Sequence, residues 1–183
     1  MASGLTDVLC LDFLNSEFRD FRGRWVRDNL QNEEWLTAFL QRWHLSGPGP
    51  IDSDTLQALI ALRSCMRRIV ESLPEGAPYP EHLAELNDFM LYASTIPHLL
   101  WKSEQYQLEL LPARKNWRWV MAEIALSLAD LLTHEDTRRL KICENNHCRG
   151  IFYDESKSRT RRYCTSDKCG NLLKLRRFRA RHT

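Results

Sequence analysis

Four of the six cysteines of this 183-residue chain lie close together near its C-terminal end. They form two pairs of equal spacing, C-x4-C-x15-C-x4-C, at Cys143, Cys148, Cys164 and Cys169. Two close pairs of thiols separated by a short excursion are typical of a tetrahedral zinc site. Four thiolates fill the coordination shell of the ion, whereas a catalytic zinc keeps an open position. The spacing therefore predicts one structural Zn²⁺ per chain and no catalytic metal.

Other uses of these cysteines stay open at this point. A disulfide is disfavoured because the N-terminal sequence has no basic segment of a signal peptide, so we expect a cytoplasmic protein with reduced thiols. A redox switch that shares the zinc thiolates has no sequence feature in its favour. His147 lies beside Cys148 and could replace one thiolate as a ligand. Cys10 and Cys65 lie in apolar segments, and we expect them in the core.

The segments around the cysteines predict the elements that hold the metal. RGIFYD predicts a strand, ESKSR a turn and TRRYC a returning strand. Ser166 or Asp167 can cap a helix that begins near Cys169. Two ligands on a knuckle and two at the start of a helix give a treble-clef-like zinc finger, built from a β-hairpin and a basic helix. A segment of roughly 30 residues cannot bury enough apolar surface to fold alone, so the metal supplies the missing free energy.

The last part of the chain is strongly basic. From Lys141 onward there are 12 Lys and Arg against 4 Asp and Glu, whereas the preceding residues hold 14 and 20. A basic helix held by zinc matches the dimensions of the DNA major groove, and Arg suits phosphates and guanine edges. A solvated basic tail is the alternative, and Arg-rich helices also bind RNA. The predicted nucleic-acid contacts are Arg159, Arg161, Arg162, Asn171, Lys174, Arg176, Arg177, Arg179 and Arg181.

The same terminal segment carries apolar residues at helical spacing. Leu172, Leu175 and Phe178 recur every three residues, so we expect this face of the helix to pack on the zinc hairpin.

The preceding residues predict mostly helix. Apolar residues recur at helical spacing in four segments, 32–43, 54–73, 81–93 and 116–132. Asp52 or Ser53 can cap the second helix, and an alternating pattern in residues 98–110 predicts a short β-hairpin. We therefore expect a mainly α protein in which an all-α domain, residues 1–138, precedes a zinc finger, residues 139–183.

Two classes of protein are disfavoured by the sequence. No stretch approaches the ~18 to 20 apolar residues of a membrane helix, so we expect no membrane partner. The sequence has no H-E-x-x-H motif, no Gly-rich phosphate loop and no nucleophile–base constellation, so we do not expect an enzyme.

The cysteine-rich segment resembles the CGNR zinc-finger proteins of bacteria. Leu172 departs from their signature, because the family has Arg there. CLDFLNSEFRD resembles the opening L-D-F-x-N motif of the all-α ABATE domain that precedes this finger, through Leu11, Asp12, Phe13 and Asn15. ALRSCMRRIVESL and LAELNDFM resemble the later A-L-R and L-N stretches of that domain. The residues that match the finger signature are Cys143, Cys148, Phe152, Asp154, Ser156, Arg161, Arg162, Cys164, Cys169, Gly170 and Asn171.

The resemblance implies a transcription regulator, with the finger on double-stranded DNA and the helical domain sensing a small molecule or stress. Asp12, Asn15 and Arg19 are candidate residues of a ligand pocket, because polar groups in an apolar region need partners. A helix cap or an internal salt bridge is the alternative role for them. The six Trp could line such a pocket or fill the core. If the signature Arg contacts DNA, Leu172 removes one contact; otherwise Leu172 extends the apolar helix face.

Two functions follow from the sequence. The first is a zinc-finger DNA-binding transcription regulator with a small-molecule effector. The alternative is a zinc-stapled RNA-binding or protein-interaction module without sequence-specific DNA binding. A homodimer suits a DNA reader because paired half-sites multiply specificity, although no heptad pattern is present.

Overall fold

A computed structural model describes residues 8–45, 48–76 and 78–181, except for the side chains at positions 176, 177, 180 and 181. The chain is mainly α, as predicted, and has three short antiparallel strand pairs among the described residues. Among the described residues, no helix is long and apolar enough to cross a membrane. The elements in chain order are α1 (Leu9–Leu14), β1 (Glu17–Arg19), β2 (Val26–Asp28), α2 (Glu33–Arg42), α3 (Ser53–Ser72), α4 (Pro80–Met90), β3 (Thr95–Lys102), β4 (Gln105–Pro112), α5 (Trp117–His134), β5 (Leu140–Ile142), β6 (Ile151–Tyr153) and α6 (Asn171–Arg181).

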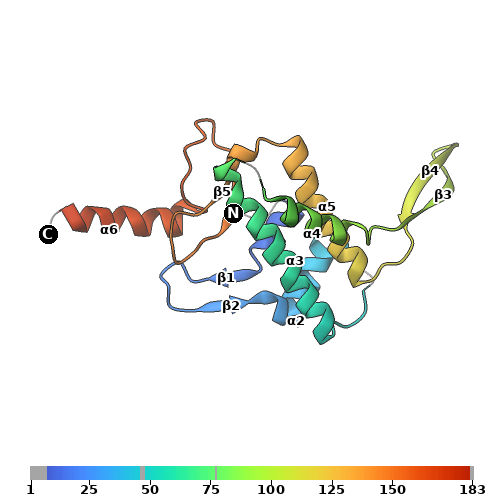
Figure 1. The fold of residues 1–183 in the computed structure, drawn as a ribbon, viewed down its shortest axis with the longest axis horizontal. Coiled ribbons are helices and arrows are strands. Elements are labelled where there is room, and N and C mark those ends of the chain that lie inside the picture. Colours follow the sequence, from blue (N-terminus) through green and yellow to red (C-terminus); the bar gives the residue numbers. More distant parts are fainter. Residues whose placement is uncertain (1–7, 46–47, 77, 182–183) are drawn as a thin grey trace.

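The predicted helices form one body around a shared apolar core (Figure 1). Three of them begin where a side-chain oxygen accepts a hydrogen bond from a free backbone N–H, which stabilises a helix N-terminus. Asn32 caps α2, Asp52 caps α3 and Asn116 caps α5. Cys10 and Cys65 are buried in this core, as predicted. The core also contains Leu140 and Ile151, which lie on β5 and β6.

The zinc-finger hairpin differs from the predicted one. The predicted returning strand TRRYC is wrong, because β6 pairs with β5, which precedes the first cysteine. The segment after β6 satisfies its backbone in another way: Arg161 N–H donates to the Asp154 carboxylate, and Glu144 N–H donates to the Arg162 carbonyl. The first cysteine pair therefore forms the end of the hairpin, and the second pair follows a loop.

The last helix also departs from the expectation in two ways. Neither Ser166 nor Asp167 caps it: Ser166–Gly170 form a π-helical turn that leads directly into α6. Leu175 and Phe178 are more than half exposed, so they do not pack on the hairpin. Phe21 and Tyr163 cover the apolar residues around the cysteines instead. As a result, α6 extends away from the body (Figure 1).

The strand pair β1–β2 was not predicted from the sequence. Each strand has three residues, too few for an alternating pattern to stand out. The turn between them uses Gly23, whose positive φ of 79° suits glycine. This hairpin brings residues of the N-terminal segment to the zinc finger.

Candidate metal centre and nucleic-acid interface

The four cysteines predicted to bind zinc come together at one point. Their Sγ atoms all lie within 4.8 Å of one another, and Cys143, Cys164 and Cys169 are buried. Cys148 Sγ lies 3.6 Å from Cys164 Sγ, which in turn lies 3.8 Å from Cys169 Sγ. His147, considered as a substitute ligand, is exposed and faces Gly23 of the β1–β2 turn. The donor set is therefore four thiols.

The chemistry of these thiols fits a single Zn²⁺. The neighbouring Cys143 thiol raises the pKa of Cys148 to about 12, and the Cys143 and Cys148 thiols raise the pKa of Cys164. Four thiolates this close repel one another unless a cation neutralises them. Zn²⁺ does so in a tetrahedral shell of four sulfurs. The chain thus has one structural zinc site, with no open position for a substrate.

Asn145 connects the metal centre to the N-terminal segment. Its side chain is buried and donates to Phe21 O at 2.8 Å, and it also lies 3.4 Å from Cys169 Sγ. The backbone carbonyl of Asn145 accepts hydrogen bonds from the N–H groups of Cys148 and Arg149, which closes the first knuckle. Asn145 was not among the predicted site residues. Its only signal in the sequence was its position between Cys143 and Cys148.

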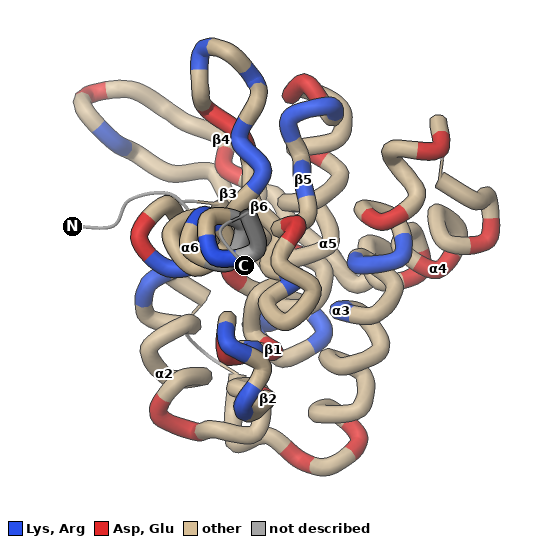
Figure 2. Tube along the Cα trace, turned by 90° about the vertical axis from the view of Figure 1, so that its left-hand side faces the viewer, with Lys and Arg blue, Asp and Glu red and all other residues tan. Residues whose placement is uncertain are grey.

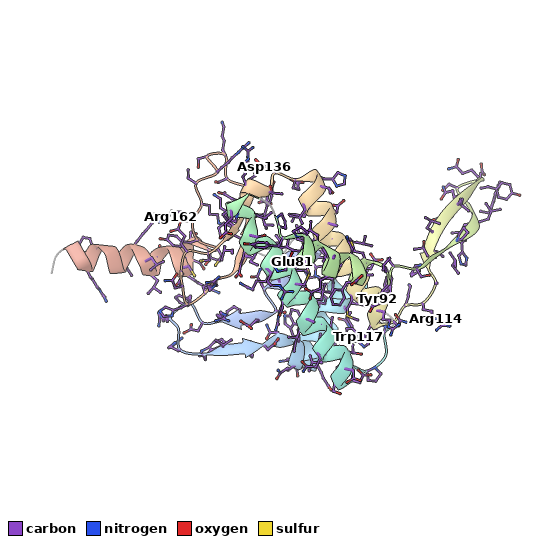
Figure 3. The ribbon with its side chains drawn as sticks, viewed as in Figure 1. Glu81, Tyr92, Arg114, Trp117, Asp136 and Arg162 are labelled. Atoms are coloured by element: carbon purple, nitrogen blue, oxygen red, sulfur yellow. The ribbon has the colours of Figure 1, made fainter. Side chains whose placement is uncertain are left out.

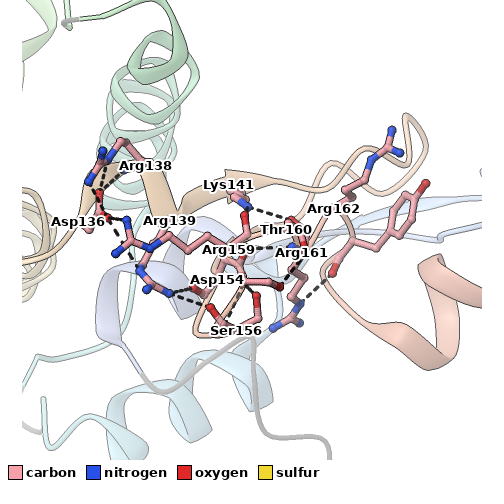
Figure 4. A network of polar contacts seen from close by, with 12 residues as sticks. Asp136, Arg138, Arg139, Lys141, Asp154, Ser156, Arg159, Thr160, Arg161 and Arg162 are labelled. Carbon is pink, nitrogen blue, oxygen red and sulfur yellow. Dashed lines mark hydrogen bonds and ion pairs between the residues drawn. The ribbon is translucent and has the colours of Figure 1, made fainter.

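Asp154 fixes the loop that leads from β6 to the second cysteine pair (Figure 4). The side chain is fully buried, and its carboxylate accepts from Lys141 Nζ at 2.6 Å and Ser156 Oγ at 2.5 Å. It also accepts from Arg161 N–H at 3.0 Å. Burial alone would raise the pKa of Asp154, but these hydrogen bonds outweigh it and hold the pKa below its usual range. The family residues of the F-x-D-x-S stretch therefore shape the finger.

The three arginines of this loop, all predicted as nucleic-acid contacts, are placed differently from one another. Arg161 donates to the carbonyls of Tyr163 and Cys164, and its guanidinium lies 4.8 Å from the Phe152 ring centroid. Those contacts tie it to the finger itself. Arg159 and Arg162 are exposed and form surface ion pairs, Arg159 with Asp136 at 2.9 Å and Arg162 with Glu144. Surface pairs of this kind are weak, so a phosphate can replace the carboxylate.

The last residues of the finger signature, Cys169, Gly170 and Asn171, lie where α6 begins. Cys169 is a thiol of the metal centre, and an added Cβ on Gly170 would lie 3.3 Å from Thr165 O, a tight contact. Asn171 is exposed and donates to Asp167 O at 3.3 Å. Leu172, which replaces the signature Arg, is half-buried.

Further along α6, the predicted contacts Lys174 and Arg179 are exposed. The side chains of Arg176, Arg177 and Arg181, also predicted contacts, lie outside the described residues.

The β1–β2 hairpin adds basic residues to the side from which α6 extends. Figure 2 views the molecule from that side and shows Lys and Arg on α6, β5, β1 and β2. Arg22 and Arg27 are exposed there, and Arg24 pairs with Asp20 at 2.7 Å. These residues were not among the predicted contacts, although the sequence RDFRGRWVRD carries an obvious excess of Arg.

The three candidate pocket residues line one cavity of about 230 Å³. It lies between the N-terminal segment and the metal centre, because Cys148, Cys164 and Cys169 line its other side. Aromatic walls come from Phe18, Phe21 and Trp35.

Each of the three also has a structural partner. Asp12 accepts from Trp43 Nε1 at 2.8 Å, and burial raises the pKa of Asp12. Arg19 pairs with Glu17. Asn15 forms two hydrogen bonds with the backbone of Ile151 on β6: its Nδ2 donates to Ile151 O at 2.8 Å, and its Oδ1 accepts from Ile151 N at 2.9 Å. The L-D-F-x-N motif thus joins the helical body to the zinc finger.

Comparison with known protein families covers nearly the whole chain. Residues 7–135 match the ABATE family, described as "Putative stress-induced transcription regulator", and residues 139–182 match the CGNR zinc finger. A search of curated proteins found no match. The ABATE match spans more than half of the chain, and the finger match contains all four thiols of the metal centre. The chain therefore belongs to the ABATE family and carries a CGNR zinc finger.

Proposed function

We propose that this protein is a DNA-binding transcription regulator of the bacterial cytoplasm, with residues 139–183 as the nucleic-acid-binding part and residues 1–138 as the sensing part. The single observation that carries the proposal is the zinc-held start of α6. Cys169 anchors the helix at the metal centre, and the exposed Lys174 and Arg179 follow on a helix that extends freely from the body. A helix of this kind has the dimensions to enter a major groove.

The neighbouring basic residues support the same conclusion. Arg159 and Arg162 on the finger loop and Arg22 and Arg27 on the β1–β2 hairpin are exposed. Cations around a groove-binding helix contact phosphates and fix the protein on the duplex, while the helix contacts base edges. The role proposed for Arg161 is different: it positions the loop, because its guanidinium is already bound to two carbonyls.

We also propose that the cavity beside the metal centre binds the effector. A cavity of about 230 Å³ suits a small molecule, with aromatic walls for an apolar body and Asp12 and Arg19 for polar groups. Because Asn15 lines the cavity and holds β6, a ligand there can change how the finger is held. No catalytic role is proposed, since four thiolates leave the zinc no open position.

Selection of bound duplexes from a random pool tests the DNA proposal. The zinc-loaded full chain should enrich one sequence, and that duplex should survive an excess of shuffled duplex at matched salt. Equal competition by shuffled duplex would refute sequence-specific regulation. Stronger competition by single-stranded or structured RNA would favour the RNA-binding alternative instead.

A further inference from the structure

One face of the β3–β4 hairpin is apolar over most of its length and is exposed to solvent. The two strands pair over eight residues each, and residues directly opposite one another share a face. Three opposite pairs form the apolar part of this face: Pro97 with Leu110, Leu99 with Leu108, and Trp101 with Tyr106; a fourth pair, Thr95 with Pro112, lies at its base. We refer to the six residues of the first three pairs as the apolar arm face. The Trp101 and Tyr106 rings meet edge to face, with centroids 4.8 Å apart.

The apolar side chains of this face are mostly exposed to solvent. The exposed fractions are 68% for Leu99, 63% for Trp101, 74% for Tyr106, 70% for Leu108 and 66% for Leu110. Together these residues expose roughly 700 Å² of surface, most of it apolar, which is comparable to the largest apolar patch of a typical monomer, about 300–600 Å². A contiguous apolar patch of that size marks an interaction site.

The opposite face of the hairpin is mixed: it carries the polar residues His98, Lys102, Gln105, Gln107 and Glu109 beside the apolar Ile96, Leu100 and Leu111. His98 lies opposite Glu109 there, and Lys102 Nζ pairs with Glu109 at 2.6 Å. The strands alternate between the two faces residue by residue, as in a sheet with one buried side.

The hairpin also has a geometry that favours a rigid, projecting arm. Ser103 and Glu104 form its two-residue turn with φ of 49° and 60°, the left-handed values of a type I′ turn. The arm lies on the opposite side of the helical body from α6 (Figure 1). In Figure 3, Arg114 marks the base of the arm and Arg162 lies near the start of α6. A two-stranded hairpin alone is marginally stable in water, so this arm gains stability from a cover on its apolar face.

We propose that the apolar arm face packs against the same face of a second copy of this chain. The face carries no charge, so its cover must be apolar and flat, and the arm of another copy meets both conditions. The surface of roughly 700 Å² is close to the ~800 Å² that each partner contributes to a standard interface.

A two-fold axis also matches large residues with small ones. When the two arms stack in opposite directions, Trp101 and Tyr106 of one copy lie over Pro97 and Leu110 of the other. Stacked sheets of this kind pack at about 10 Å. The inference does not depend on DNA binding, because dimerisation is measured without DNA.

Sedimentation velocity of the zinc-loaded full chain tests this dimer. The mass obtained for the wild type should be twice the chain mass of 21.6 kDa. Leu108→Glu should weaken the dimer at least about tenfold, because each arm then buries a charge in an apolar interface. Gln107→Glu is the matched control: the same new residue at the neighbouring position of the same strand, on the opposite face, should leave the dimer intact.

A mixing experiment identifies the second copy as the partner. Leu108→Lys should also be monomeric alone, and an equimolar mixture with Leu108→Glu should form a heterodimer through opposite charges. One zinc per chain and an unchanged circular dichroism spectrum would establish that both variants are folded. A monomeric wild type, an equal effect of Gln107→Glu, or a mixture that stays monomeric would each overturn the proposal.

Discussion

Arg63 and Asp154 are buried polar residues that each hold two or more segments of the chain together. Arg63, on α3, donates to Ser16 Oγ at 2.9 Å and forms a two-bond ion pair with Asp28. This is the Arg of the A-L-R stretch by which the chain resembles its family. A buried charge is costly to leave unpaired, so each such residue fixes its partners in place.

Asp28→Asn tests the buried pair in the helical body. Burial alone would raise the pKa of Asp28, but the hydrogen bonds and charge of Arg63 outweigh it and lower the pKa below the usual 3.8. The charged pair therefore stabilises the fold above pH 3.8 and loses this contribution as the pH falls through the lowered value. We expect Asp28→Asn to cost about 3 kcal/mol of unfolding free energy near neutral pH, measured by urea denaturation.

The pH profile and a control variant check the cause of that loss. The difference from wild type should shrink in acid, where the wild-type carboxylate is also neutral. Asp88→Asn, at an exposed position of α4, should change stability little. A cost that stays constant down to the most acidic pH would contradict the ion-pair explanation.

Asn15→Asp tests the connection between the helical body and the zinc finger. The carboxylate can still accept from Ile151 N–H, but it can no longer donate to Ile151 O, and the two oxygens would repel each other. We expect a loss of about 1–3 kcal/mol and faster amide hydrogen exchange in β6. Asn87→Asp, exposed on α4, is the control. Unchanged exchange at Ile151 would show that this contact does not hold the strand.

At the scale of elements, the helices and the β3–β4 hairpin that were predicted from local sequence patterns are present in the structure. Helical spacing predicted α3 and α5, Asp52 was one of two residues predicted to cap α3, and alternation predicted the β3–β4 hairpin. The returning strand TRRYC was wrong because strand type depends on a distant partner, and β5 was already paired with β6.

The prediction of the candidate site was limited in the same way, because some of its contacts join residues far apart in the sequence. Cysteine spacing predicted the metal centre, because two close pairs of cysteines separated by a short segment are typical of a tetrahedral zinc site. It could not reveal Asn145, whose partner Phe21 lies 124 positions away. Periodicity placed Leu175 and Phe178 on one side of α6, but it could not tell whether that side meets protein or solvent.

Gly23→Ala tests the packing of the β1–β2 hairpin on the first zinc knuckle. Gly23 has a positive φ, and an added Cβ would lie 2.4 Å from His147 Nδ1, so both strain and a clash arise. We expect a loss of more than about 1–2 kcal/mol, the cost of left-handed backbone strain alone. Thermal unfolding of the zinc-loaded chain measures it.

His147→Ala separates strain from the clash. The contact at Gly23 is with the His147 side chain, so removing that side chain leaves only the backbone strain at position 23. His147→Ala added to Gly23→Ala should therefore restore part of the lost stability. A double variant as unstable as Gly23→Ala alone would mean that the contact with His147 contributes nothing.

At the scale of the whole molecule, the basic residues around α6 and the apolar arm face lie on opposite sides of the helical body (Figure 1). This separation lets the two surfaces be tested independently. Substitutions around α6 should change DNA binding alone, and substitutions on the arm should change oligomeric state first.

Lys174→Gln tests the phosphate contacts of the proposed DNA-binding surface. Loss of one phosphate contact should weaken binding to all duplexes similarly and reduce the slope of log affinity against log salt by about 1. Fluorescence anisotropy over a range of salt concentrations measures both. Lys102→Gln, on the distant hairpin, should leave affinity and slope unchanged. An unchanged slope for Lys174→Gln would exclude this residue from the interface.

The most direct test of the account is whether DNA binding depends on zinc. Affinity for the selected duplex should be measured with the zinc-loaded chain, after removal of zinc by a chelator, and after zinc is restored. Without zinc, the four thiols no longer hold the start of α6, so specific binding should be lost and then recovered on reloading. Cys164→Ser should behave like the zinc-free chain. Specific binding that survives complete removal of zinc would contradict the claim that the metal centre positions the DNA-binding helix.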